Sequence, residues 1–293
     1  MSFSEKYNDI RKLAQTELSL IEEKMVSPIS IREPLNTYVI KFLKAPSKRI
    51  RPLLAVLYMK AHNETLSDKQ LELLAAIELV HNASLIHDDI IDESKLRRGH
   101  KTISEEFDNK LGVISGDYIL SIAMAKIAQI GSIEILDKFS ATLKQMCIGE
   151  INQNFDRFQI GTIENYIEKS KNKTAYLFET ALVCTAMLSD ARHDILKAGN
   201  FAMNVGIAFQ IRDDLINCTN TDSTKPSNND IEDGIYNAPI IYAQNTEDYS
   251  AGIEKTRSLL NNYINCAKMN VESAGNNQYA EALRTFLELL NNE

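Results

Sequence analysis

The sequence lacks the marks of several large classes of protein. Its 4 cysteines are widely spaced and form no C-x-x-C pair, so we expect neither a zinc site nor a disulfide framework, and a reducing compartment is favoured. No run of about 18 apolar residues occurs, because Asp117 and Glu179 interrupt the most apolar stretches. We therefore expect no membrane-spanning segment.

Positive charge is also scarce. The chain has 32 Lys and Arg residues against 40 Asp and Glu residues, a formal net charge of -8. Proteins that bind nucleic acid usually present a strongly basic surface, so no nucleic-acid partner is expected. The net charge does not exclude an anionic small-molecule ligand, because a metal ion and a few arginines can make the electrostatic potential of one cleft positive. Residues 1–12, MSFSEKYNDIRK, contain acidic groups and no apolar segment, so we expect no signal peptide and a cytoplasmic location.

Strand-like alternation is absent, and no proline lies between Pro52 and Pro226. Apolar residues recur instead at three-to-four spacing in residues 71–91, 111–130, 133–151 and 201–216. This pattern predicts an all-α protein, a single domain of long helices over residues 1–293. In detail it predicts an amphipathic helix over residues 1–24, a helix capped by Ser67, a helix ending around Phe158 and a mobile polar loop over residues 218–234.

Three aspartates, Asp88, Asp89 and Asp92, form a D-D-x-x-D pattern. In a helix Asp88 and Asp92 stand one turn apart on one face, and His81 and Ser84 precede them on that face. Carboxylates this close repel each other unless positive charge lies between them, and hard cations such as Mg²⁺ prefer oxygen ligands. A solvated acidic face is the alternative, but the neighbouring residues are apolar and favour a site.

Several cations accompany this motif. Arg97 and Arg98 follow five residues after its last aspartate, and arginine binds phosphate bidentately while keeping its charge. The turn PSKRIRP (residues 46–52) and the pair Lys173-Thr174 each precede an apolar helix. Either is a solvated turn or a phosphate grip at a helix N-terminus.

A second acidic motif, FQIRDDLIN, occupies residues 209–217. Asp213 and Asp214 repeat the spacing of the first motif, with Asn217 in the third place, and Gln210 stands one turn before Asp214. Two such helices facing each other would hold Mg²⁺ ions, nearby cations would hold diphosphate, and apolar faces would hold a hydrocarbon. These parts suit the ionisation of an allylic diphosphate. No Ser-His-Asp set is visible.

With both aspartate motifs, the Arg-Arg-Gly and the Phe-Gln, the sequence resembles the trans-polyprenyl diphosphate synthases of the long-chain type over roughly residues 48–239. The resemblance implies an all-α isoprenoid-synthase fold around a central cavity, usually in a homodimer. It implies head-to-tail condensation of isopentenyl diphosphate with an allylic diphosphate, with two or three Mg²⁺ ions. It is also compatible with a transient contact with a membrane during product release.

The resemblance also implies roles for residues. The metal ligands would be Asp88, Asp89, Asp92, Asp213 and Asp214. The allylic diphosphate would be held by Arg97, Lys173, Thr174, Gln210 and Lys225. Isopentenyl diphosphate would be held by Lys48, Arg51, His81 and Arg98. The expected catalytic residues are Asp88, Asp92, Arg97 and Lys173, and the departing diphosphate is the expected base.

The sequence departs from the family pattern at four places: Pro46-Ser47 for Gly-Gly, Asn217 for an aspartate, Thr224 for a glycine and Ile235 for a lysine. These departures leave open a non-catalytic partner subunit of a heteromeric synthase. A terpene cyclase is disfavoured, because it needs no second-diphosphate grip at Lys48, Arg51 and Arg98.

Product length is expected to depend on Ala83 and Ser84, which precede Asp88 by about one turn. In short-chain members of the family an aromatic ring commonly stands near this place, whereas here both residues are small. A hexaprenyl to octaprenyl product is therefore favoured over farnesyl or geranylgeranyl. A plug from elsewhere, such as Tyr118 or Phe155, is the alternative.

Overall fold

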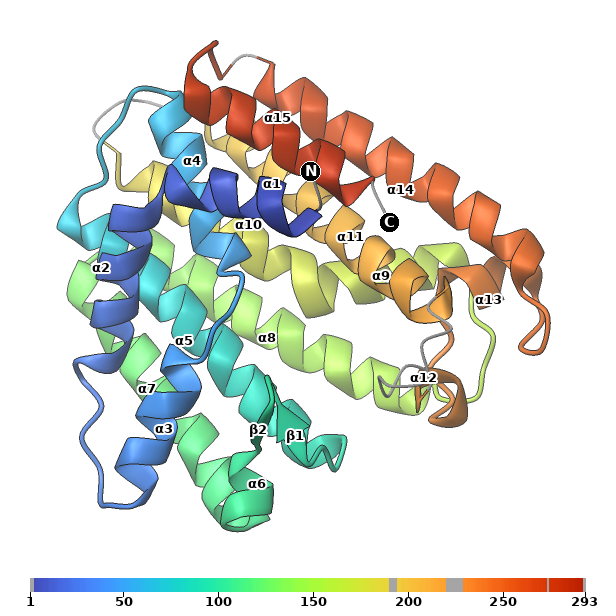
Figure 1. Cartoon of the computed structure of the whole chain (residues 1–293), viewed down its shortest axis with the longest axis horizontal. Helices are drawn as coiled ribbons and strands as arrows, with labels where there is room; N and C mark the ends of the chain where they lie inside the picture. The colour runs from blue at the N-terminus through green and yellow to red at the C-terminus, as the bar shows by residue number, and fades with distance from the viewer. Residues whose placement is uncertain (1–2, 190–193, 220–228, 273, 292–293) are drawn as a thin grey trace.

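The computed structural model describes residues 3–189, 194–219, 229–272 and 274–291, and within these ranges it confirms an all-α bundle (Figure 1). The long helices of the bundle are α5 (Asp68–Ile91), α7 (Asn109–Ile130), α8 (Ile133–Phe155), α11 (Ile195–Thr219) and α14 (Ser250–Val271). The shorter helices are α1 (Phe3–Lys12), α2 (Gln15–Val26), α3 (Leu35–Lys44), α4 (Ile50–Ala61), α6 (Ile103–Glu106), α9 (Ile163–Ser170), α10 (Tyr176–Met187), α12 (Asn229–Glu232), α13 (Ala238–Ala243) and α15 (Gln278–Leu290).

Helix α5 lies at the centre of the bundle, with contacts to α2, α4, α7 and α10. Its start is fixed by a capping box, in which the Ser67 side chain accepts from the Gln70 backbone N–H and the Gln70 side chain accepts from the Ser67 N–H. This confirms the predicted cap. Its 24 residues span about 36 Å and end at the first aspartate motif.

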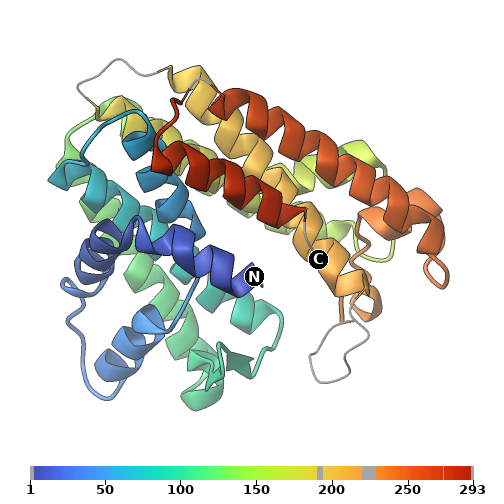
Figure 2. The same cartoon turned by 45° about the horizontal axis from the view of Figure 1, so that its top comes forward.

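The second aspartate motif is carried by α11, which packs against α10 and α14, and Figure 2 shows α14 and α15 running along it. Both motifs lie near the C-terminal end of their helix. The helix dipole puts partial negative charge at that end. The fold therefore adds to the repulsion among the carboxylates.

Two predicted helix boundaries differ from the structure, and one short hairpin was not predicted. The helix expected over residues 1–24 is broken between α1 and α2, because α1 packs on α15 whereas α2 packs on α5. Helix α8 ends at Phe155, after which Phe158 takes a left-handed conformation (φ 61°) and its N–H donates to the Gly234 carbonyl. A short hairpin, β1 (Leu96–Arg97) with β2 (His100–Lys101), stands where no strand was expected. Of the expected loop over residues 218–234, residues 220–228 lie outside the described part of the chain.

By length and composition, helix α7 could cross a membrane. Of the residues in its most apolar 18-residue stretch, 33% are buried inside the protein. A single helix of this kind is weak evidence for a membrane span, because core helices of soluble proteins can be equally long and apolar. Here α7 packs along α5. The expected absence of a membrane span stays a prediction.

A π-helix, η1 (Lys171–Ala175), joins α9 to α10 at the point where the sequence predicted the start of an ordinary helix. Glycines on two other helices make room for it. A Cβ at Gly206 of α11 would lie 2.5 Å from Ala175 Cα, and one at Gly149 of α8 would lie 2.7 Å from Asn172 Cβ. The π-turn, which is common at functional sites, thus depends on close backbone contact with both neighbours.

Gly206→Ala should lower the free energy of unfolding by about 1–3 kcal/mol, because the added methyl group overpacks the contact with Ala175. Gly161→Ala is the matched control, since a Cβ there has no atom within 4 Å. Urea denaturation of both variants measures the difference. Equal stability of the two would show that η1 does not need this close contact.

Candidate active site

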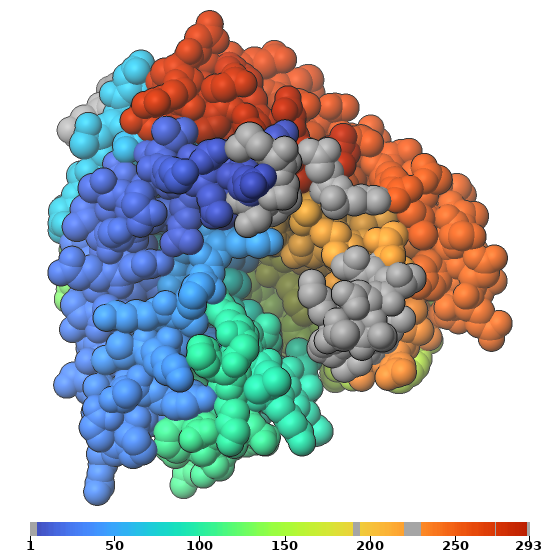
Figure 3. Space-filling view, in the orientation of Figure 1, coloured from blue at the N-terminus to red at the C-terminus, as the bar shows by residue number. Residues whose placement is uncertain are grey.

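A cavity of about 500 Å³ opens between the ends of α5, α8, α9 and α11 and the segment after α12. Figure 3 shows the surface hollowed between the segment near residue 100 and the segment near residue 210. Charged and amide side chains line most of it, including the predicted site residues Asp92, Arg97, Lys173, Gln210, Asp213 and Asp214. The structure thus brings the two aspartate motifs to one cavity.

In the first motif the three aspartates have different surroundings. Asp92 lines the charged cavity, and Asp88 lines an adjoining apolar one. The Asp89 carboxylate instead accepts from the Arg97 guanidinium, with distances of 2.8 Å from Nε and 2.6 Å from Nη2. Asp89 therefore orients Arg97, and its assignment as a metal ligand stays a prediction. Burial raises the pKa of Asp88 to about 6, with further increases from Glu150 and Asp92.

The second motif is held by hydrogen bonds. Asp214 is buried and accepts from the Tyr166 hydroxyl at 2.6 Å and from Gln210 Nε2 at 3.0 Å. The Gln210 amide oxygen accepts in turn from the Thr174 hydroxyl at 2.6 Å. Burial raises the pKa of Asp214 to about 6, although both hydrogen bonds act in the opposite direction. Asn217 lines the same cavity.

The π-helix delivers Lys173 to the cavity. Its ammonium group lies 3.4 Å from the Glu150 carboxylate and 3.4 Å from the Gln153 amide oxygen, both on α8. Glu150 and Gln153 were not among the residues predicted for the site. Their three-residue spacing, which places both side chains on one face of α8, is the signal that the sequence offers for them.

The predicted grip for a second diphosphate surrounds His81. Burial holds the pKa of His81 well below its ordinary value. Four cationic neighbours lower it further: Arg51, Arg98, Arg49 and Arg97. His81 is therefore neutral at physiological pH. The Arg51 guanidinium lies over the Phe178 ring at 4.7 Å, and Arg98 donates to the Asn82 amide oxygen at 3.4 Å.

The three cations of the turn before α4 divide into two roles. Arg49 is 3% exposed and pairs with Glu78 at 3.2 Å and Glu22 at 3.1 Å, so it stabilises the fold. The Lys48 side chain is exposed. Burial raises the pKa of Asp213 across the cleft, and the charges of Lys48 and Arg51 partly oppose this rise. Of the other predicted residues, Lys225 and Thr224 lie outside the described part of the chain, and Ile235 lines the charged cavity.

The donor set fits a hard divalent cation. The carboxylates of Asp92, Asp213 and Asp214 and the amide of Asn217 face one cavity, and oxygen ligands of this kind suit Mg²⁺. Among the described residues, no three His, Cys, Asp or Glu side chains lie close enough to form a cation site by themselves. Asp92, Asp213, Asp214 and Asn217 would hold such an ion together with oxygen atoms of a bound anion, and the ion would supply charge neutralisation there.

An apolar cavity of about 230 Å³ adjoins the charged one and shares Lys173 with it. Its walls come from α5, α7 and α8, and its lining includes Ala83, Ser84, Leu120, Leu143 and Met146. Neither suggested plug lines it. The Tyr118 hydroxyl accepts instead from the Ser30 N–H at 3.0 Å, and Phe155 is 75% exposed.

Asp88→Asn should stabilise the metal-free protein at pH 7.5 by about 1 kcal/mol, which corresponds to about 2–4 °C in Tm. The physical reason is that a carboxyl group with a folded pKa of about 6 and an ordinary pKa of 3.8 binds its proton more tightly in the folded state. Ionisation of Asp88 therefore lowers the free energy of unfolding as the pH rises from 3.8 through 6.

Thermal denaturation in the presence of a chelator measures this gain, which should vanish near pH 4. Asp137→Asn, which neutralises an exposed carboxylate on α8, is the control. A loss of stability in Asp88→Asn at pH 7.5 would contradict the interpretation of Asp88 as an uncompensated charge.

Comparison with known proteins identifies the family of the chain. The family model for polyprenyl synthetase matches residues 32–282. A prenyl transferase from Cyanidium caldarium is 33% identical over 78% of this chain and 72% of its own length. Component 2 of a heptaprenyl diphosphate synthase from Geobacillus stearothermophilus is 31% identical over 81% of this chain and 75% of its own length.

The fold is shared with a polyprenyl synthase from Caulobacter crescentus, solved with calcium and isoprenyl diphosphate. The two structures superpose with a TM-score of 0.86 over 98% of both chains at 21% identity. By its sequence and its fold, the chain belongs to the polyprenyl synthetase family and is a prenyltransferase.

Proposed function

We propose that this protein condenses isopentenyl diphosphate with an allylic diphosphate, head to tail and with Mg²⁺, to a product of hexaprenyl to octaprenyl length. The observation that carries the proposal is the junction at Lys173 between a charged cavity and an apolar one. A diphosphate bound in the first would direct its hydrocarbon into the second. The solved relative that contains calcium and isoprenyl diphosphate supports a divalent metal and a diphosphate ligand.

In this reaction the chain first holds the allylic diphosphate. Arg97, oriented by Asp89, and Lys173, oriented by Glu150, present fixed positive charge to it. The Thr174 hydroxyl lies beside them, bonded to Gln210, and Lys225 stays a predicted ligand. Such preorganised charge stabilises the departing diphosphate more than the intact substrate. Mg²⁺ bound by the aspartates would supply further charge neutralisation.

The second diphosphate would bind at Lys48, Arg51, His81 and Arg98. Because His81 is neutral, it contributes a hydrogen bond without adding to the repulsion among these cations. Apolar side chains of the adjoining cavity exclude water from the cationic carbon left by ionisation. The departing diphosphate is the proposed acceptor of the final proton.

The proposed enzyme is a cytoplasmic homodimer. Exposed apolar residues on α7 and α8 support an interface there: Val113, Ile114, Ile133 and Ile151 are each at least 44% exposed. Light scattering of the purified chain gives the mass that tests this. A non-catalytic subunit of a heteromeric enzyme is the second candidate, supported by Asn217 in the weakened motif and by the relative named as component 2.

Incubation of the purified chain with labelled isopentenyl diphosphate, allylic primers and Mg²⁺ tests the function. We expect turnover by the chain alone, abolished by a chelator, and a loss of several orders of magnitude in Asp88→Ala because a metal ligand is missing. Near-native turnover in Asp88→Ala would contradict the site assignment. Turnover only after addition of another subunit would favour the heteromeric alternative.

Ser84→Phe should shorten the product while leaving the first condensation largely intact, because the ring would fill the apolar cavity beside Asp88. Chromatography of the labelled products measures chain length. Ser258→Phe is the matched control, since Ser258 also donates to a helix carbonyl but is exposed on α14. A wild-type product that stops at farnesyl diphosphate, or an unchanged length in Ser84→Phe, would refute this account of the cavity.

A further inference from the structure

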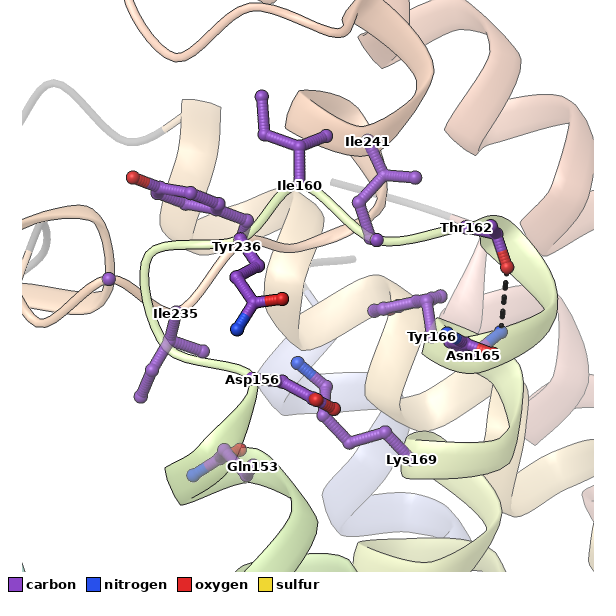
Figure 4. A pocket seen from close by; sticks show the side chains of 13 residues that line it. Gln153, Asp156, Ile160, Thr162, Asn165, Tyr166, Lys169, Ile235, Tyr236 and Ile241 are labelled. Carbon is purple, nitrogen blue, oxygen red and sulfur yellow. Dashed lines mark hydrogen bonds between the residues drawn. The ribbon is translucent and has the colours of Figure 1, made fainter.

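Lys169 on α9 lines the charged cavity but was not among the residues predicted for it. It also lines a smaller neighbouring cavity of about 130 Å³, where Figure 4 shows its side chain extending toward Asp156 and Gln153. The sequence alone left a solvated turn open for the lysines of residues 169–173. The structure places Lys169 in the interior of the cleft instead, because α9 continues into the π-helix.

The Lys169 ammonium group lies over an aromatic ring. It lies 5.6 Å from the centre of the Tyr166 ring, one turn earlier on α9. Tyr166 is buried, and its hydroxyl donates to Asp214. Lys169 thus lies beside the second aspartate motif and contacts the residue that donates a hydrogen bond to this motif.

The other cations of the charged cavity have carboxylate partners at contact distance, Arg97 with Asp89 and Lys173 with Glu150. Within the described ranges, Lys169 makes no hydrogen bond or ion pair of this kind, although Asp214, Asp230 and Asp156 are its acidic neighbours. Lys173 is also a neighbour, so two ammonium groups face the same space. An anion between them would relieve their repulsion and complete the contacts of Lys169.

The second motif has a neutral residue where a third carboxylate is usual. Asp213 and Asp214 carry charge, and Asn217, which lines the cavity beside them, does not. A motif with two carboxylates binds divalent cations less strongly than one with three. A fixed ammonium group at this place supplies positive charge that needs no metal ligand.

We propose that Lys169 binds the allylic diphosphate together with Lys173, on the side of the cavity that faces the second aspartate motif. This inference rests on the proposed function, because it concerns the same diphosphate. In this role Lys169 contacts the substrate and keeps its contact with the diphosphate after the bond to the hydrocarbon is broken. Part of the charge neutralisation at the second motif then comes from the protein.

Calorimetric titration with inorganic diphosphate at saturating Mg²⁺ tests the proposal without a turnover measurement. Lys169→Met should weaken diphosphate binding about tenfold or more, the effect of losing one charge-assisted hydrogen bond. Lys169→Arg should restore most of the affinity. Lys171→Met is the matched control, because Lys171 pairs with Glu168 at 3.3 Å and lines neither cavity.

A titration with Mg²⁺ alone separates binding from a structural role. Removal of a cation near Asp214 should leave metal affinity unchanged or raise it, so the two affinities should move differently in Lys169→Met. If both fall together, Lys169 positions the aspartates and the proposal is overturned. Lys169→Gln, measured beside it and checked by its melting temperature, covers the case in which the Met variant is misfolded.

Lys173→Met distinguishes this proposal from the function on which it rests. If the wild-type protein binds diphosphate and Lys173→Met weakens it while Lys169→Met does not, the role of Lys169 is refuted and the site stands. If the wild-type protein binds no diphosphate with Mg²⁺, both the site and the role of Lys169 are refuted.

Discussion

Repulsion among carboxylates is the constraint on which the rest of the structure depends. Helices α5 and α11 each bring aspartates to one cavity at their negative ends, where both the helix dipole and burial disfavour charge. The raised pKa values of Asp88 and Asp214 express this cost. A core of apolar helix faces offsets it, so that the site can hold carboxylates whose charge a bound divalent cation would neutralise.

Neighbouring ion pairs give each cation a distinct task. Arg49 forms ion pairs with Glu22 and Glu78 and stabilises the start of α4. Arg97 and Lys173 each use one carboxylate to fix their direction while they still line the cavity. Simple proximity in the sequence does not separate these cases, because Arg49 lies between Lys48 and Arg51 in the same turn.

The sequence was sufficient for the fold class, the Ser67 cap and both aspartate motifs, because helical periodicity and local spacing determine them. It was insufficient where distant segments meet. The π-helix depends on close contact with Gly149 and Gly206, and the break between α1 and α2 depends on two different packing partners. The pairing of Asp89 with Arg97 and the inward direction of Lys169 likewise need the folded arrangement of the hairpin and α9.

The junction at Lys173 also has an evolutionary consequence. Because the charged and apolar cavities share this one side chain, the residues that line the far wall of the apolar cavity on α7 and α8, such as Leu120 and Leu143, are separate from those that line the charged cavity. In the proposed reaction, substitutions on that wall would alter how much hydrocarbon is accommodated without disturbing ionisation. The length of the product and the ability to ionise the substrate could therefore change independently among descendants of one ancestral sequence.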